Sequence, residues 1–157
     1  MNNETCNING HITFEVIRDG EVIDTREIKN LIVSSGKAAM AALCLVDVAE
    51  TAFDYIALGT GTTAADAGDT TLETEITTNG GERRGGADVT GTRVTTSVTD
   101  DTAQLVTTFA FTGSFAITES GILNAGALGE LLARQVFAAI NVASGDSLQI
   151  TWKVQFS

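Results

Sequence analysis

The C-terminal stretch SLQITWKVQFS, residues 147–157, most constrains the fold, because apolar and polar residues alternate along it. The apolar positions are Leu148, Ile150, Trp152, Val154 and Phe156. A period of two is that of a β-strand with one face buried and the other solvated. We therefore predict a strand here, with Trp152 packed in the core rather than displayed for a ligand.

Turn signals separate this strand from others like it. The chain contains no proline, so glycine, asparagine and aspartate must make its turns. Asp19-Gly20 predicts a hairpin over residues 11–28, and Asp100-Asp101 a turn between two Thr/Val-rich strands. Alternation leaves the strand order open and fits a sandwich or a barrel. We expect an all-β fold: an antiparallel, jelly-roll-like β-sandwich with an N-terminal β-hairpin and one short α-helix.

The helix is expected over residues 36–46, where the period changes. Ser34 or Ser35 can cap its first turn, and Met40, Leu43 and Cys44 follow the spacing of one helical face. Because the run carries little charge, we expect the helix to be buried on most sides, with Cys44 a buried thiol.

The chain of 157 residues is expected to form one domain over residues 11–157. Residues 1–10 are polar and are expected to form a flexible arm that orders against a neighbouring subunit. The longest apolar run is far shorter than the roughly 20 residues of a membrane span, and the start lacks a secretory signal pattern. A net charge of −11 argues against nucleic-acid binding; it mainly favours solubility, and is also compatible with attraction to a basic partner surface.

The stretch YIALGTGTTAADAGDTTLETEI, residues 55–76, raises the question of a phosphate or metal loop. Its Gly59 and Gly61 are not followed by the third glycine and helix of a dinucleotide site, nor by the Gly-Lys-Ser/Thr of a P-loop. We interpret both as turn residues. The acidic residues between them and residue 76 do not match an EF-hand, and a solvated acidic loop is favoured over an irregular calcium site.

The sequence offers few residues for nucleophilic catalysis or for zinc binding. His11 is the only histidine, is expected to be exposed or on an edge strand, and no Gly-x-Ser-x-Gly elbow accompanies it. Cys6, Cys44 and His11 are too few for a structural zinc site. Arg83-Arg84, between glycine pairs, is expected to be an exposed, mobile loop tip. We assign no catalytic, cofactor-binding or metal-binding residue, and expect no enzyme activity.

Several segments, taken together, carry a resemblance. They are IALGTGTT with the following acidic loop (Ile56–Glu75), ESGILN (Glu119–Asn124), LLARQVF (Leu131–Phe137) and GDSLQITW (Gly145–Trp152). In this set the chain resembles a family of small virion structural proteins of tailed bacteriophages and prophages. The hairpin and helix of residues 14–37 also look like the opening of such proteins. Leu123 departs from the family, which often has an aromatic residue there.

The resemblance implies a component of the phage particle and transfers no functional residue. Members include capsid decoration (cement) proteins and tail-fibre pieces. The short, compact chain favours a head decoration protein, implying a homotrimer on the capsid surface, bound to the major capsid protein and stabilising capsomer joints after synthesis in the host cytoplasm. The alternative is a tail-fibre or host-recognition module.

Overall fold

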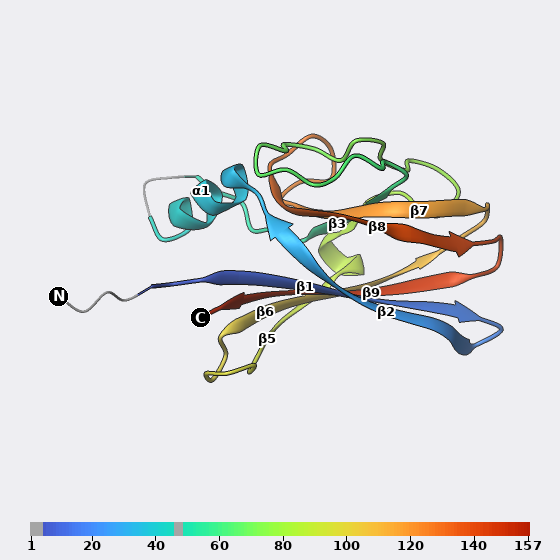
Figure 1. Cartoon of the computed structure of the whole chain (residues 1–157), viewed down its shortest axis with the longest axis horizontal. Coiled ribbons are helices and arrows are strands. Elements are labelled where there is room, and N and C mark those ends of the chain that lie inside the picture. Colours follow the sequence, from blue (N-terminus) through green and yellow to red (C-terminus); the bar gives the residue numbers. More distant parts are fainter. Residues whose placement is uncertain (1–4, 46–48) are drawn as a thin grey trace.

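The computed structural model describes residues 5–45 and 49–157 as an antiparallel β-fold with one short α-helix, α1 (Ser34–Ala42), and one 3-10 turn, η1 (Gly86–Asp88) (Figure 1). The strands are β1 (Ile8–Arg18), β2 (Glu21–Ile32), β3 (Tyr55–Gly59), β4 (Arg84–Gly85), β5 (Thr90–Val94), β6 (Thr102–Ala110), β7 (Phe115–Leu123), β8 (Leu131–Val142) and β9 (Ser147–Phe156). The all-β fold with a single short helix is thus confirmed.

All nine strands belong to one sheet, in the order β4-β3-β7-β8-β2-β1-β9-β6-β5. Strand β2 joins its two parts, because only Leu31 and Ile32 pair with β8, while the rest of β2 pairs with β1. Beyond this junction the sheet curls, and the two parts face each other as sandwich-like layers (Figure 1). A jelly roll has two separate sheets, whereas here one long strand runs through both layers.

The predicted hairpin is present and longer than expected. Asp19 and Gly20 both have positive φ, 52° and 83°, as a two-residue hairpin turn requires. Strand β1 begins at Ile8, so Ile8–Gly10 belong to the sheet and not to an N-terminal arm. Asn7 also exchanges backbone hydrogen bonds with Ser157. Of the expected arm, residues 1–4 lie outside the described residues.

The main core fills the space between the two layers. Strand β9 lies between β1 and β6, and the expected alternation holds along it: Trp152 has no exposed surface. The rings of Phe14 on β1 and Phe137 on β8 meet across the layers, 4.6 Å apart. Phe156, at the end of β9, differs, since it is 37% exposed at the rim of the core.

Helix α1 begins and ends earlier than predicted. Its N-cap is Val33, with no side-chain cap bond. Neither serine caps it: Ser34 is the first helical residue, and the Ser35 hydroxyl donates to the Leu131 carbonyl at 3.1 Å. The last helical residue is Ala42, and Val46, the expected end, lies outside the described residues.

The expectation that this helix is buried on most sides was wrong. It packs on β8 through a narrow strip of small residues, Gly36 and Ala39. A Cβ on Gly36 would lie 2.2 Å from the Leu132 carbonyl oxygen, so the approach of helix to strand requires glycine. The opposite side faces solvent, and Cys44, just beyond the helix, is an exposed free thiol, as is Cys6. The low number of charged residues in this helix therefore does not mean that it is enclosed: only its Gly36 and Ala39 side is buried.

An ion pair fastens the first hairpin to the β8–β9 turn. Arg18 donates through Nε and Nη2 to the two carboxylate oxygens of Asp146 at 2.8 and 2.7 Å, and the Ala143 N–H donates to the same carboxylate. These hydrogen bonds, that of Arg18 first, lower the pKa of Asp146 to about 2. Because the folded pKa lies below the ordinary value of 3.8, the bonds stabilise the fold above about pH 4, and this contribution is lost as the pH falls toward 2.

We expect Asp146→Asn to remove this part of the acid sensitivity. Urea unfolding at about pH 6 and about pH 3 should show a smaller pH-dependent loss of stability in the variant than in the wild type. Glu21→Gln, at an exposed position of β2, is the control and should keep the wild-type loss. Equal losses in the two variants would contradict the assignment.

Candidate functional site

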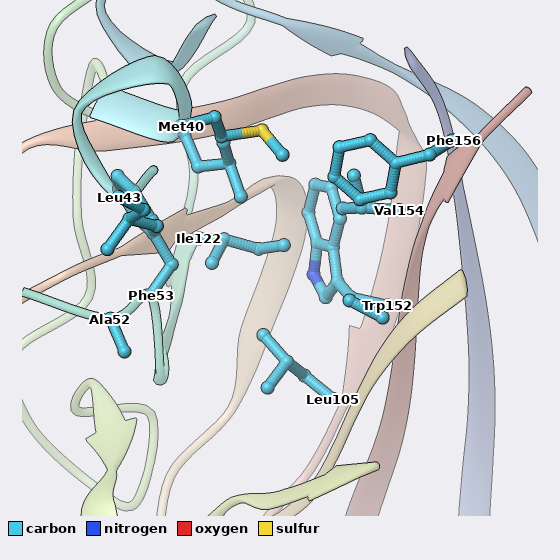
Figure 2. Close-up of a pocket in the computed structure, with 11 residues that line it drawn as sticks. Met40, Leu43, Ala52, Phe53, Leu105, Ile122, Trp152, Val154 and Phe156 are labelled. Carbon is cyan, nitrogen blue, oxygen red and sulfur yellow. The ribbon is translucent and has the colours of Figure 1, made fainter. Parts of the chain in front are cut away.

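A half-enclosed apolar cavity of about 250 Å³ opens between the two layers at the end that carries α1 (Figure 2). Figure 2 shows Trp152 and Phe156 of β9 on one wall, and Met40 of α1 with Leu43 on the facing one. The described residues that line the cavity are Met40, Leu43, Ala52, Phe53, Ala103, Leu105, Ile122, Leu132, Trp152, Val154 and Phe156. Every one of these side chains is apolar except for the Trp152 indole nitrogen.

That single polar group is already satisfied. The Trp152 indole N–H donates to the Ser120 hydroxyl at 3.3 Å, and this hydroxyl donates to the Ala57 carbonyl at 2.9 Å. Since Trp152 is fully buried, it forms the floor beneath the residues at the mouth. Among the residues that the structure describes, those lining the cavity therefore offer contact with apolar groups and include no side chain that could transfer a proton or attack a substrate.

The mouth of the cavity has an exposed apolar rim. Leu43 is 47% exposed and Phe156 37%. We call these two cavity-lining residues, Leu43 and Phe156, the apolar rim. Rims of large side chains around a hollow are typical of surfaces that contact another molecule.

A second feature is a buried polar cluster that holds the long segment between β3 and β4. This segment, residues 60–83, lies across the outer face of β3, β7 and β8 (Figure 1). Beneath it is a small separate core made of Val33, Ala57, Leu72, Leu123 and Leu131. Because a segment of this length with little regular structure is uncommon in a compact domain, its attachment needs a physical cause.

Glu119 of β7 supplies most of that attachment. Its carboxylate is fully buried and accepts backbone N–H groups of Gly61, Thr74 and Glu73 at 3.0, 2.7 and 3.0 Å. The Arg134 guanidinium on β8 donates to it through Nε at 2.9 Å. One carboxylate thus binds both arms of the loop and the neighbouring strand.

Arg134 extends the cluster to the middle of the loop. Its side chain is 3% exposed and donates to Asp69 at 2.8 Å and to the Thr63 carbonyl at 3.2 Å. Burial lowers the pKa of Arg134, but the hydrogen bonds to Asp69 and Glu119 outweigh it and raise the pKa. Burial likewise raises the pKa of Asp69, and the Asp66 N–H and Arg134 outweigh it and lower that pKa.

Gly59 and Gly61 serve this cluster, and the interpretation of both as turn residues needs correction. Gly59 is the last residue of β3, bridged to Glu75. A Cβ on Gly59 or Gly61 would come within 2.4 or 2.5 Å of the Glu119 Oε1. The Gly-x-Gly spacing therefore lets the backbone approach a buried carboxylate of the same chain.

The neighbouring acidic residues are less solvated than expected. Asp69 binds Arg134, Glu73 accepts from the Thr63 N–H and hydroxyl at 2.8 Å each, and Glu75 pairs with Arg83 through two bonds of 2.9 and 2.6 Å. Within residues 5–45 and 49–157, no group of three or more His, Cys, Asp or Glu side chains is placed to hold a metal ion.

Arg83 and Arg84 do not form an exposed loop tip, so that expectation was wrong. The Arg83 side chain is 10% exposed and also donates to the Ala125 and Leu128 carbonyls. Arg84 lies in β4, paired with β3. His11 is exposed, as predicted, but on β1 in the interior of the sheet rather than on an edge.

Comparison with protein-family models, with curated protein sequences and with solved structures finds no match for this chain. No helix in the described part of the chain is long and apolar enough to cross a membrane.

Proposed function

We propose that this chain is a non-enzymatic structural protein of a tailed-bacteriophage particle, acting as a head decoration (cement) protein. The observation that carries the proposal is the apolar rim around a cavity whose described lining has no reactive side chain, at one end of the β-fold. Such an end is suited to contact with another protein surface. The two segments that resemble the phage family contribute to both features. Glu119 and Arg134 belong to the buried polar cluster, and Ile122 and Leu132 line the cavity.

The buried ionisable groups support a structural role. Glu119, Arg134 and Asp146 are each at most 3% exposed, and all three bind groups of this same chain. Their hydrogen bonds fix a long loop and a turn, so they stiffen the surface of the fold. A stiff surface loses little conformational entropy when it binds, which favours affinity.

The proposed partners are two further copies, giving a homotrimer, and the major capsid protein. Burying one Leu or Phe side chain of the rim contributes about 1.5–3 kcal/mol. A protein that binds only the assembled shell stabilises it by mass action, and each occupied site adds to the effect. In this proposal the chain is made in the host cytoplasm and resides on the capsid surface.

Antibody-gold labelling of phage particles released by the host tests the proposal. Gold over the icosahedral shell supports a decoration protein. Gold confined to the tail tip overturns that place and favours the alternative, a tail-fibre or host-recognition module. Particles without gold, when denatured particles also lack the chain by immunoblot, would overturn a role in the particle altogether.

We expect Phe156→Glu to weaken shell binding at least about tenfold, because a charge would replace an apolar contact at the rim. Co-sedimentation with shells that lack the chain measures the loss. Val22→Glu is the matched control, since Val22 is 53% exposed on the hairpin strand β2 and is not part of the rim. Equal weakening in both variants, or in neither, would show that the rim is not the contact surface.

A further inference from the structure

The outer face of the layer formed by β2, β1, β9, β6 and β5 carries a cationic row. His11 on β1 lies directly opposite Lys29 on β2 and directly opposite Lys153 on β9. The next residue across is Gln104 on β6. Side chains of directly opposite residues share a face of the sheet and lie within contact distance. Three basic side chains thus stand side by side on a protein whose net charge is −11.

Lys29 and Lys153 differ from the arginines of this chain in their ion pairing. All six arginines form an ion pair with a carboxylate, at distances from 2.6 to 3.9 Å. Among the described residues, neither Lys29 nor Lys153 takes part in one. The ammonium groups of Lys29 and Lys153, on either side of His11, are therefore available to an external anion.

Two surface hollows adjoin this cationic row, and His11 lines both of them. One hollow, of about 260 Å³, is lined by His11, Thr13, Glu27, Thr96, Thr102, Lys153 and Gln155. The other, also of about 260 Å³, is lined by Ile8, Asn9, Gly10, His11, Lys29, Asn30 and Gln155. The two share His11 and Gln155, so they adjoin. The β5–β6 loop contributes Thr96, and gives the first hollow a wall above the flat sheet.

We propose that these adjoining hollows bind a small hydroxylated organic anion, of which a hexuronic acid is the simplest example. The Lys29 and Lys153 ammonium groups and a His11 ring N–H donate to its carboxylate. The Thr13 hydroxyl and the Glu27 carboxylate bind its hydroxyl groups. Charge-assisted hydrogen bonds of this kind are the strong ones. The site is separate from the apolar rim and does not depend on the proposed role in the particle.

The opposing charges near the site are few and identifiable. Glu27 lies diagonal to His11, since its direct partner is Thr13. Asp101, in the adjoining loop, is occupied by the N–H groups of Thr96, Ser97 and Val98. Within the described parts of the chain, Glu27 is therefore the one carboxylate in the lining of the two hollows, and its removal should strengthen the binding of an anion while weakening any contact with hydroxyl groups.

The test is a titration of the full chain with sodium glucuronate, followed by amide NMR shifts, with glucose and inorganic phosphate as separate titrations. We expect saturable shifts at His11, Lys153 and Gln155 with glucuronate, and none with glucose. Lys153→Gln and Lys29→Gln should each weaken binding roughly three- to tenfold. Lys37→Gln is the matched control, because Lys37 is exposed on α1, and should bind as the wild type does.

Two results with the wild type and the lysine variants would overturn the proposal, and a third comes from Glu27→Gln. One is the absence of saturable shifts with glucuronate in the folded wild type. The other is equal weakening by Lys37→Gln and Lys153→Gln, which would show general charge attraction. Glu27→Gln should have the opposite effect to the lysine variants, because it removes a negative charge from the lining. We expect phosphate, which has no alcohol groups, to bind about two- to fivefold more tightly to this variant than to the wild type. Unchanged or weaker phosphate binding to it would place the anion elsewhere.

Discussion

Replacing Glu119 with leucine is expected to lower the free energy of unfolding by about 3–5 kcal/mol. The fully buried carboxylate binds three backbone N–H groups and Arg134. Without it, Arg134 keeps only partners that belong to the loop, Asp69, Glu73 and the Thr63 carbonyl, and three N–H groups lose their acceptor. For a chain of this length, Tm should fall by roughly 6–20 °C. Thermal unfolding followed by circular dichroism measures the change.

The loss of stability in Glu119→Leu should be concentrated in the loop of residues 60–83. Hydrogen exchange of the Gly61, Glu73 and Thr74 amides should accelerate more than that of amides in β9, because the loop loses its attachment while the main core stays packed. Glu21→Leu, at an exposed position, is the control and should change stability by less than about 0.5 kcal/mol. A Glu119→Leu protein that melts like the control would show that the cluster does not stabilise the fold.

A double variant separates the ion pair from the loop bonds. Glu119→Leu combined with Arg134→Leu removes the buried cation as well as the carboxylate. We expect the double variant to lose less stability than the sum of the two single changes, since no unpaired buried charge remains. It should still be less stable than the wild type, because the three N–H groups lack their acceptor. Additive losses would contradict direct coupling between the two side chains.

The strands that could be predicted are those whose pattern is local. Alternation along residues 147–157 and the Asp19-Gly20 turn depend on neighbouring residues, and the structure has both the strand and the hairpin. The place of β9 between β1 and β6 pairs His11 with Lys153, far away in sequence. No local pattern records such a pairing, so the strand order and the continuity of the two layers through β2 needed the structure.

The buried polar cluster escaped prediction for a related reason. Glu119 and Arg134 are charged residues within apolar segments, and such interruptions are the signal by which the cluster could have been suspected. The register of β7 on β8 shifts between Ile117 and Glu119, and the loop partners come from residues 61–74. A glycine pair and an acidic loop were visible in the sequence, but not the buried carboxylate that brings them together.

The second large effect is expected at Trp152, where Trp152→Ala should cost about 3–5 kcal/mol of unfolding free energy. This is the largest fully buried side chain, and it forms the floor of the apolar cavity. Its loss would extend the existing cavity of about 250 Å³ into the core between the layers. Trp152→Phe should cost less, because most of the apolar volume stays, although the indole hydrogen bond to Ser120 is lost.

Urea unfolding followed by far-ultraviolet circular dichroism compares these variants, since both lack the only tryptophan. Phe156→Ala is the matched control at the rim of the same cavity, where partial exposure should limit the loss to about 1.5 kcal/mol. The enlarged cavity of Trp152→Ala should also bind benzene, because its described lining is apolar, and benzene should then raise its Tm more than that of the wild type. If Trp152→Ala lost no more stability than Phe156→Ala, β9 would not be packed between the layers as the structure has it.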